Sequence, residues 1–331
     1  EKEAPVSTAA TERWLIADIG GTNSRVGCWT RGRPHDQIEE LELMQNERYG
    51  GIEDLLHAYL DRLQGEPPRA AGLAIAAPIT GNRVDMLNID WSFEQDRLAE
   101  RFGLAELYVI NDFEAIACAL PSLRGEDCLE IGGGAGLPGR SLAVLGPGTG
   151  LGVAGLVISD AGYIPVSGEG GHMTLPAVND EEMLIVSRVR DELGHCSAER
   201  ILSGEGIARL HQGIHGGGRP KARDVSEAAR NGDEAAMRTF NLFFDFLGTV
   251  ASDVALVFGA LSGVYIAGGI VPANLGLFRR SGFTERFVDK GRYRDYLAGI
   301  PLRLITAATP GLTGMAAFCD PDSRIRTQRT R

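Results

Sequence analysis

The chain has 331 residues, of which 44% are hydrophobic and 23% are charged, as in an ordinary globular protein. Because a domain averages roughly 150 residues, this length predicts about two domains. The formal net charge of −11 argues against nucleic acid or an anionic membrane surface as the main partner. It leaves room for an anionic ligand held by local backbone amides.

The cysteines and the two ends of the chain indicate a cytoplasmic protein. The five cysteines are scattered and form no CxxC pair, so we expect neither a disulfide framework nor a zinc ribbon. The start, EKEAPVSTAATER, contains no apolar segment of the kind found in signal peptides. We expect residues 1–13 to form a flexible tail, and the arginine-rich end after Asp320 to be flexible as well.

The uncharged stretch from Val254 to Phe278 is about as long as a membrane span. Five glycines and Pro272 interrupt it. The positions of these glycines and of the proline predict the end of a helix, a turn, a buried strand over Val264–Ala267 and a glycine loop. We therefore expect no membrane partner.

Strand-like and helix-like segments alternate along the chain, which predicts an α/β architecture. The expected strands are Trp14–Ala17, Val26–Trp29, Ala71–Ala77, Leu107–Ile110 and Ser141–Leu145. The expected helices are Ile52–Leu63, Phe93–Phe102, Phe113–Leu120, Glu181–Leu193, Ser203–His211, Val225–Asn231 and Glu234–Phe258. The stretches LIADIGGTNSRVGCW and LAVLGPGTGLGVAGLVI each join two strands through a glycine turn. Two such similar halves, facing one another, would form a cleft.

Three glycine turns follow expected strands: DIGGTNSR (18–25), GPGTGLG (146–152) and AGGIVP (267–272). Turns this poor in side chains expose backbone N–H groups that can hold phosphate oxygens. The alternative for the first is a hairpin turn with an aspartate beside it. The chain has no GxxxxGK[ST] motif, and its one GxGxxG match, Gly134–Gly139, precedes a strand rather than a helix. The turns therefore indicate a different phosphate-binding design.

The stretch YVINDFEAIA (108–117) places Asn111 and Asp112 between an expected strand and an expected helix. One interpretation is helix capping, since Asn and Asp are favoured at helix starts. The other is ligand binding, because ligands bind at the carboxyl ends of strands in α/β sheets. From these ten residues alone, capping is the more frequent explanation.

Taken together, these motifs resemble those of the bacterial-type glucokinases of the hexokinase–actin–sugar-kinase superfamily. The matching stretches are LIADIGGTNSRVG, LAIAAPITGN, VINDFEAIA, GPGTGLGVA, GEGGHMTLP, HCSAERILSG and VYIAGGIVP, in the family's order from about residue 14 to about residue 317. The resemblance implies two actin-like, ribonuclease H-like α/β domains that flank a central cleft. Residues 14–121 plus about 308–331 would form the small domain, and residues 122–307 the large one.

The activity implied by the resemblance is ATP-dependent phosphorylation of glucose at its 6-hydroxyl, the first step of glycolysis, with Mg²⁺ assisting an in-line transfer. The glycine turns would contact ATP: Gly20, Gly21, Thr22, Asn23, Gly148, Thr149 and Gly150 at the phosphates, and Gly268 and Gly269 near the adenosine. Asp18 would help to hold Mg²⁺ through water. The glucose-binding set would be Asn111, Asp112, Glu169, His172 and Glu199, with Asp112 as the catalytic base. Relatives suggest a homodimer.

The chain departs from related patterns at three places. HCSAER contains the single Cys196 where neighbouring repressor and kinase relatives carry a cysteine cluster, so we expect no structural zinc. Asp90 stands where the family often has histidine, which puts a sugar contact there in doubt. His211 and His215 have i,i+4 spacing without an HExxH glutamate, which favours the surface end of a helix.

Phosphoryl transfer to a sugar hydroxyl explains why an aspartate would suit position 112. A sugar hydroxyl must lose a proton as the P–O bond forms, and a helix N-terminus favours the ionised carboxylate and lowers its pKa. A loose transition state takes the proton late, so a weak, well-oriented base is sufficient. Capping and catalysis are therefore compatible at Asp112. Two alternatives stay open: a kinase for another hexose, and a non-catalytic sugar sensor, although residues 1–13 are too few for the helix-turn-helix of such regulators.

Overall fold

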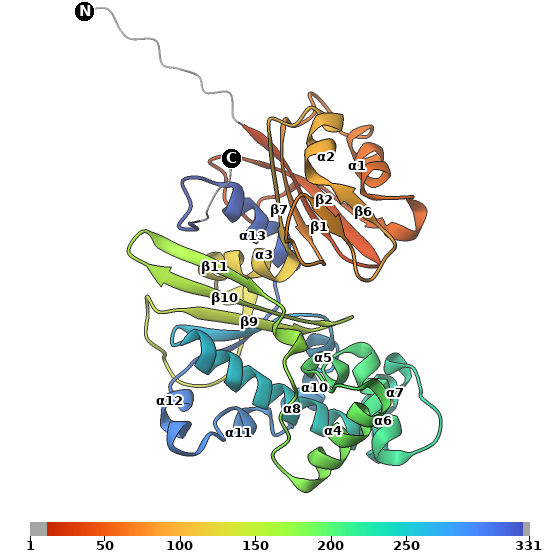
Figure 1. Cartoon of the computed structure of the whole chain (residues 1–331). Coiled ribbons are helices and arrows are strands. Elements are labelled where there is room, and N and C mark those ends of the chain that lie inside the picture. Colours follow the sequence, from red (N-terminus) through yellow and green to blue (C-terminus); the bar gives the residue numbers. More distant parts are fainter. Residues whose placement is uncertain (1–11, 327–331) are drawn as a thin grey trace, which may run out of the picture. The chain divides into compact units, whose positions relative to one another are not determined.

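The computed structural model of the protein describes residues 12–326 (Figure 1). Its contacts divide the chain into two compact units. The first unit comprises the described residues up to Ser122 together with those from Thr309 onward, and the second comprises Leu123–Ala308. Most of the expected N-terminal tail lies outside the described residues, but Arg13 already belongs to the first strand.

The first unit is built on a five-stranded sheet with the order β3-β2-β1-β4-β7. Its strands are β1 (Arg13–Ile19), β2 (Asn23–Thr30), β3 (Glu39–Gln45), β4 (Ala70–Ile75) and β7 (Glu106–Asn111). β1 pairs antiparallel with β2 and parallel with β4, and β4 pairs parallel with β7. The register sets Asp18 opposite Ala74, and Ile75 opposite Asn111. The carboxyl ends of β1, β4 and β7 therefore lie along one edge.

Helices cover both faces of this sheet. They are α1 (Ile52–Leu60), α2 (Gln95–Phe102), α3 (Asp112–Ala119) and α13 (Pro310–Cys319). Leu15, Ala17 and Ile19 of β1 share a buried cluster with the apolar faces of α1 and α2. Because side chains alternate along a strand, Asp18 points to the opposite face. On that face α3 and α13 pack against each other and against the parallel strands.

One predicted helix in this unit needs correction, and one strand was missed. The helix expected over Phe93–Phe102 begins only at Gln95, because residues 92–94 form β6 (Ser92–Glu94), which pairs with β5 (Arg83–Asp85). β3 was not predicted at all. Its sequence, EELELMQ, alternates leucine with glutamate, but Leu41 and Leu43 are 46% and 65% exposed and Met44 is its buried residue.

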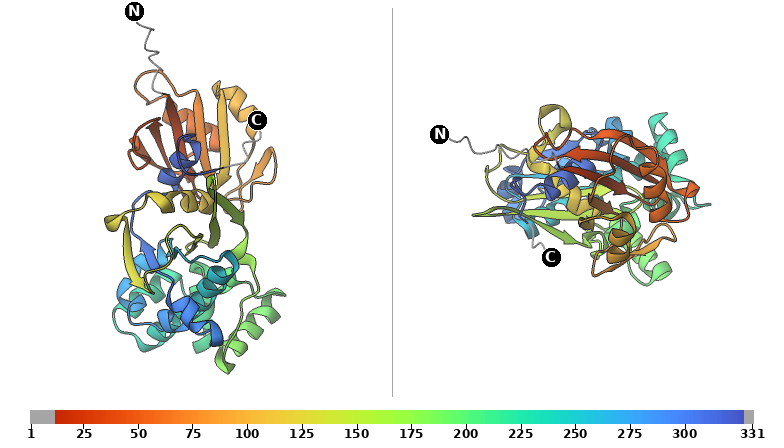
Figure 2. Two further views of the ribbon diagram at one scale, coloured as in Figure 1. Left: turned by 90° about the vertical axis from the view of Figure 1, so that its left-hand side faces the viewer. Right: turned by 90° about the horizontal axis from the view of Figure 1, so that it is seen from above.

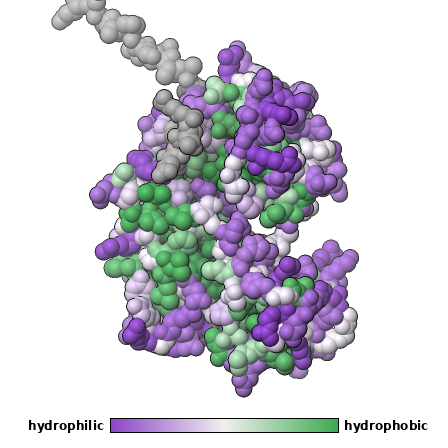
Figure 3. Space-filling model, in the orientation of Figure 1, coloured by the Kyte–Doolittle hydropathy of each residue, from purple (hydrophilic) through white to green (hydrophobic). Residues whose placement is uncertain are grey.

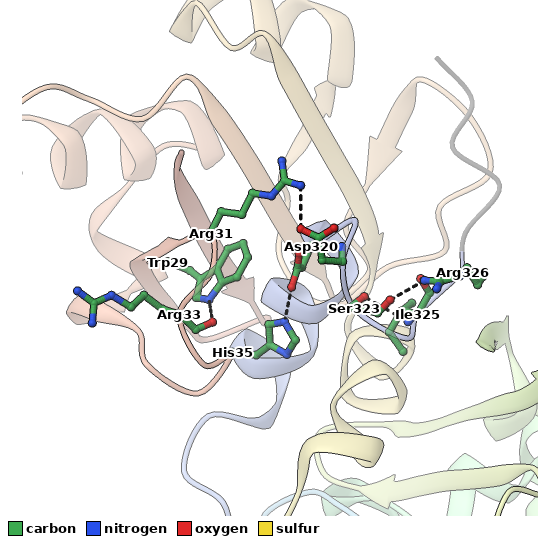
Figure 4. A network of polar contacts seen from close by, with 9 residues as sticks. Trp29, Arg31, Arg33, His35, Asp320, Ser323, Ile325 and Arg326 are labelled. Atoms are coloured by element: carbon green, nitrogen blue, oxygen red, sulfur yellow. Dashed lines mark hydrogen bonds and ion pairs between the residues drawn. The ribbon is translucent and has the colours of Figure 1, made fainter. Parts of the chain in front are cut away.

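The chain end after α13 is held to the segment between β2 and β3 of the first unit (Figure 4). Asp320 Oδ2 lies 2.9 Å from His35 Nε2, and Asp322 forms an ion pair with Arg31 at 2.9 Å. The side chain of Ile325 is 7% exposed. The prediction of a flexible end is therefore wrong for residues 321–326, while residues 327–331 lie outside the described part.

The second unit contains a six-stranded sheet with the order β11-β10-β9-β12-β13-β8. The strands are β8 (Cys128–Gly132), β9 (Leu142–Pro147), β10 (Leu151–Ser159), β11 (Gly162–Gly168), β12 (Gly263–Ile266) and β13 (Leu302–Ile305). β11, β10 and β9 are antiparallel neighbours, and β9, β12 and β13 are parallel. This repeats the pattern of the first unit, with β8 added at the edge. The similarity of the two halves, expected from sequence, is confirmed at the level of topology.

The helices of the second unit are α4 (Asp180–Leu193), α5 (Ala198–Ile201), α6 (Gly204–His215), α7 (Ala222–Arg230), α8 (Glu234–Phe258), α9 (Ile270–Ala273), α10 (Leu275–Phe278), α11 (Phe283–Phe287) and α12 (Arg294–Ala298). α8 is the central one and packs against β9 and β10 (Figure 2). Phe240, Phe243, Phe244 and Phe246 of α8 are fully buried. α8 is long and apolar enough to cross a membrane, but 72% of its apolar window is buried inside the protein, as in a core helix.

The uncharged stretch 254–278 folds as predicted. It contains the end of α8, the buried strand β12, a glycine turn and the short helices α9 and α10.

The strand β11 forms one edge of the six-stranded sheet, and its side chains Ile164 and Val166 are 43% and 37% exposed. A hydrophobic area is visible on the face drawn in Figure 3.

Candidate functional site

The glycine turn of the first unit joins β1 to β2. The N–H of Gly20 donates to the carbonyl oxygen of Asn23 at 3.2 Å, which closes the turn. Gly21 lies against Asn88, because an added Cβ would come within 2.7 Å of the Asn88 Cβ. Thr22 and Asn23 are exposed. The turn thus exposes polar side chains at the carboxyl end of β1.

Asn46, which was not predicted from the sequence, stabilises this turn through three hydrogen bonds. Its Nδ2 donates to the carbonyl of Gly20 at 2.8 Å, and its Oδ1 accepts from Ser24 Oγ at 2.7 Å. Its backbone N–H donates to the carbonyl of Thr22 at 3.0 Å. Asn46 and Ser24 are both fully buried. The sequence offered no signal for Asn46, because β3 (Glu39–Gln45), the strand that it follows, was not predicted.

Asp18 lies near the end of β1, opposite Arg25 of β2. It is partly buried, and this burial raises the pKa of its carboxyl group, an effect that Arg25 opposes. Gly311, in the first turn of α13, lies against it: an added Cβ would be 2.8 Å from Asp18 Oδ2. The first turn of a helix carries unsatisfied N–H groups and favours a nearby anion. Sequence placed Asp18 at a strand end, but the contact with α13 comes from the opposite end of the chain.

Asn111 and Asp112 lie at the carboxyl end of β7, on the same sheet edge as Asp18. Asn111 caps α3: its Oδ1 accepts from the N–H groups of Phe113 and Glu114 at 2.9 and 3.2 Å. Its Nδ2 donates to the carbonyl of Ala77 at 3.3 Å. The capping interpretation is therefore confirmed for Asn111. Asp112 is the first residue of α3, and its Oδ1 also accepts from Phe113 N, at 3.0 Å.

In the second unit, the turn between β9 and β10 is tied to Glu199. The N–H of Gly148 donates to the carbonyl of Gly150 at 2.8 Å. Glu199 Oε2 accepts from the N–H of Leu151 at 2.9 Å, directly after the turn. Glu199 belongs to the short helix α5 and is partly buried. A carboxylate in the first turn of a helix is favoured by the helix dipole, and this one also reaches the glycine turn.

The GEGGH segment packs beside the same turn. Its central residues form the 3-10 helix η4 (Gly170–His172), which Glu169 precedes. An added Cβ on Gly171 would lie 2.1 Å from the carbonyl oxygen of Leu151, so only glycine fits this contact. Glu169 Oε2 and His172 Nε2 are 3.9 Å apart, and both side chains are about half exposed. The backbone of Leu151 therefore contacts both the GEGGH and the SAER segments.

The third glycine turn meets the second at the end of β9. Gly268 has a φ of +81°, and an added Cβ would lie 2.4 Å from the carbonyl oxygen of Pro147. A side chain is therefore disfavoured there both by backbone conformation and by space. β9 and β12 are parallel neighbours, so their glycine turns emerge at one edge of the sheet.

The predicted site residues thus form two groups, one in each unit. The first unit brings together Asp18, Gly20, Gly21, Thr22, Asn23, Asn111 and Asp112, and the second brings together Gly148, Thr149, Gly150, Glu169, His172, Glu199, Gly268 and Gly269. The predicted helix end at His215 is also observed, with its Nε2 2.9 Å from the carbonyl oxygen of Ala235. His211 is partly buried beside Thr239, and burial lowers its pKa.

Asp18 is the candidate ligand for Mg²⁺ at the glycine turn of the first unit. Among residues 12–326, no group of three or more His, Cys, Asp or Glu side chains is arranged to hold a metal ion. Mg²⁺ commonly takes one or two carboxylates and completes its coordination with water and substrate phosphates. The single carboxylate of Asp18, beside the glycine turn, fits that mode.

Comparison with known proteins identifies the family. The family model for glucokinase matches residues 15–321. A glucokinase of Aromatoleum aromaticum is 41% identical over 324 residues, which cover 96% of this chain and 97% of that protein. A solved glucokinase from an Antarctic psychrotroph is 35% identical with a TM-score of 0.82, covering 92% of this chain and 98% of that one.

A more distant structure shows the shared fold. The ROK family glucokinase of Streptomyces griseus, solved with glucose and AMPPNP, has a TM-score of 0.61 at 23% identity, with 92% of this chain and 98% of that one covered. The expected sugar-kinase fold is thereby confirmed. Together with the match over nearly the whole sequence, these findings show that the chain belongs to the glucokinase family.

Proposed function

We propose that this chain transfers the terminal phosphoryl group of ATP to the 6-hydroxyl of glucose, forming glucose 6-phosphate, with Asp112 as the general base. Membership of the glucokinase family supports the overall reaction. The observation that favours Asp112 is that its neighbour Asn111 already caps α3. Asn111 accepts from the N–H groups of Phe113 and Glu114, so the contact of Asp112 Oδ1 with the same Phe113 N–H adds little to the capping of α3. A carboxylate beside it is explained better by proton transfer.

ATP would be held by the three glycine turns. The turn at Gly20–Asn23 and the turn at Gly148–Gly150 offer backbone N–H groups to the phosphates, and Gly268–Gly269 leave room for the adenosine. Asn46 positions the first turn, and Glu199 positions the second. Mg²⁺, when bound, would neutralise charge on the transferred phosphoryl group. Asp18 would hold it through water.

Glucose would be read by Asn111, Asp112, Glu169, His172 and Glu199. Carboxylates and amides can each bind two hydroxyls, so a sugar that lacks a matching hydroxyl leaves a buried polar group unpaired. Glu169 and His172 are close enough to contact neighbouring hydroxyls. Asp112 would accept the proton of the 6-hydroxyl as the bond to phosphorus forms.

We also propose a cytoplasmic homodimer without nucleic-acid or membrane partners. The apolar side chains exposed on edge strand β11 support self-association. The measurement is the mass in solution by light scattering, for the wild type and for Ile164→Lys. A wild-type monomer at micromolar concentration would contradict the dimer.

The test of the reaction is ADP release from Mg·ATP with glucose, fructose, mannose and N-acetylglucosamine in turn. We expect turnover with glucose that falls roughly 10²-fold or more in Asp112→Ala, as loss of a general base requires. The matched control is Asp61→Ala, an exposed carboxylate of the same unit beside His57, which should retain full activity.

The other outcomes separate the alternatives. Preferred turnover of another hexose would favour a different acceptor. Glucose binding by calorimetry without turnover of any sugar would favour the sensor. Unchanged turnover in Asp112→Ala would leave Asp112 with a structural role only.

A further inference from the structure

A cavity of about 630 Å³ opens in the second unit between α4, α6 and the loop that follows α6. Ile185, Val189 and Ile214 provide apolar lining, and Arg188, Arg209 and Arg219 provide charge. The cavity contains none of the residues proposed to bind ATP or glucose. Its volume lies within the range of small-molecule sites.

Arg209 is the most unusual of the lining residues because it is only 5% exposed. Its Nη1 donates to the carbonyl of Arg200 at 2.9 Å, and its Nη2 contacts Glu205. Its Nε is buried and has no hydrogen-bond partner among the described residues. A buried N–H without a partner is costly, so the guanidinium retains unused capacity to donate.

The other two arginines converge on the same space from different elements. Arg188 of α4 donates from Nη1 to the carbonyl of Gly213 at 2.5 Å. Arg219 donates from Nε to Gln212 Oε1 and from Nη2 to Glu192 Oε1, both at 2.9 Å. Arg219 therefore bonds to both helices that line the cavity, α6 through Gln212 and α4 through Glu192.

The charge of this cavity is opposite to that of the whole protein. Three arginines and the single carboxylate of Glu192 line it. Glu205, outside the lining, adds a second carboxylate beside Arg209 and Arg219. The sum is still positive in a chain whose net charge is −11. A site of this kind favours a small anion.

We propose that this cavity binds the phosphate group of a small metabolite and that binding adjusts the proposed sugar site. Guanidinium groups match phosphate oxygens with paired, charge-assisted hydrogen bonds. Phosphate can arrive as inorganic phosphate or as a sugar phosphate, which share this chemistry. The apolar lining would accommodate the carbon skeleton of a sugar phosphate.

Arg209 connects the cavity to the proposed catalytic residues. It binds the carbonyl of Arg200, the neighbour of Glu199 in α5. Glu199 in turn accepts from the N–H of Leu151 at the glycine turn. An anion that draws Arg209 toward the cavity would shift α5 and change the affinity for glucose. This regulatory part rests on the proposed function, whereas the binding part does not.

The binding test is a thermal-shift titration of the full chain with sodium phosphate at constant ionic strength. A saturating non-hydrolysable ATP analogue keeps the nucleotide site occupied. The variants are Arg188→Gln and Arg219→Gln, and the control is Arg223→Gln, an exposed arginine of α7 outside the cavity. Arg209 is left intact because its contacts support α5.

We expect a saturable rise of Tm in the wild type and the control, with affinity at least tenfold weaker in the two cavity variants. Absence of a saturable rise, or equal rises in all four proteins, would overturn the site. Parallel titration with glucose 6-phosphate identifies the source of the phosphate. Tighter binding that is lost in the cavity variants indicates a sugar phosphate, and weaker or equal binding indicates inorganic phosphate.

The regulatory test is the KM for glucose with and without saturating phosphate. We expect a change of at least twofold in the wild type and in Arg223→Gln, and none in Arg188→Gln or Arg219→Gln. An unchanged KM in the wild type would overturn the regulation. Because the thermal shift does not require turnover, failure of the proposed reaction can be told apart from failure of the cavity site.

Discussion

The carboxylate of Glu199 accepts a hydrogen bond from the backbone N–H of Leu151, with 2.9 Å between Oε2 and N. The bond joins a helix start to the glycine turn of the β9–β10 hairpin. Glu199 therefore has two proposed roles. Its Oε2 holds the glycine turn that would bind ATP, and its carboxylate would also contact glucose.

Glu199→Ala should raise the KM for both substrates. Loss of a hydrogen bond to a charged group costs about 1.5–3 kcal/mol, or roughly tenfold or more in affinity. Glu199→Gln keeps an oxygen that can accept from Leu151, so its KM for ATP should return close to the wild-type value while its KM for glucose stays raised. Steady-state kinetics with each substrate varied in turn measures both. Identical behaviour of the two variants would show that the contact with Leu151 does not matter for ATP.

Asn46→Ala should raise the KM for ATP about fivefold or more and leave the KM for glucose within about twofold. The change removes the donor to Gly20 and the acceptor for Ser24, and each buried group left without a partner costs about 1–3 kcal/mol. Asn46→Asp keeps the acceptor for Ser24 but sets an acceptor oxygen against the carbonyl oxygen of Gly20 in a buried position, so it should be impaired at least as much as Asn46→Ala. Kinetics at saturating glucose measures the effect.

The control for Asn46 is Asn179→Ala. Asn179 caps α4 through the N–H of Glu182 and lies outside the glycine turns. It should lower Tm without changing the KM for ATP. If Asn46→Ala behaves like this control, the role of Asn46 is stability alone.

Asp18→Asn should stabilise the fold at neutral pH while lowering activity. Burial raises the pKa of Asp18 above its ordinary value, so the folded state holds a proton more tightly than the unfolded chain does. The wild type is therefore relatively more stable below the unfolded pKa and loses this contribution as pH rises through the folded pKa. An uncharged amide avoids the loss. The gain in the free energy of unfolding should shrink toward zero as the pH approaches 3.

Denaturation of wild type and Asp18→Asn across pH 3–8 measures this difference. A lower stability of the variant at pH 7 would mean that Arg25 and the first turn of α13 outweigh the burial of the carboxylate. A pH-independent difference would place its origin in packing rather than ionisation.

Glu182→Ala should destabilise the second unit by about 3–5 kcal/mol, as does removal of one partner from a buried ion pair. Glu182 is fully buried. Its Oε1 accepts from Arg286 Nη2 at 2.6 Å, and its Oε2 accepts from Val178 N at 2.9 Å. Urea denaturation measures the loss. A matched surface variant, Glu181→Ala, removes a half-exposed partner of Arg238 and should cost no more than about 1 kcal/mol. Equal losses would contradict the prediction.

Local patterns determined much of this protein. The uncharged stretch 254–278 folds into helix, buried strand and glycine turn as its punctuation indicates, and Asn111 caps α3 as its position between strand and helix indicates. Glycine turns after strands were recognisable because backbone conformation and capping depend on neighbouring residues. β3 was not predicted although leucine alternates with glutamate in EELELMQ; Leu41 and Leu43 are exposed, and the strand is defined by its pairing with β2.

Only the tertiary structure determines which residues hold the proposed site residues in place. Asn46 reaches Gly20, Gly311 lies against Asp18, and Glu199 reaches Leu151. In each pair the residues are far apart in sequence and belong to different elements. Periodicity and turn chemistry report which segments become strands and helices. Which of them become neighbours depends on strand order and on the packing of buried faces, and those are properties of the whole folded unit.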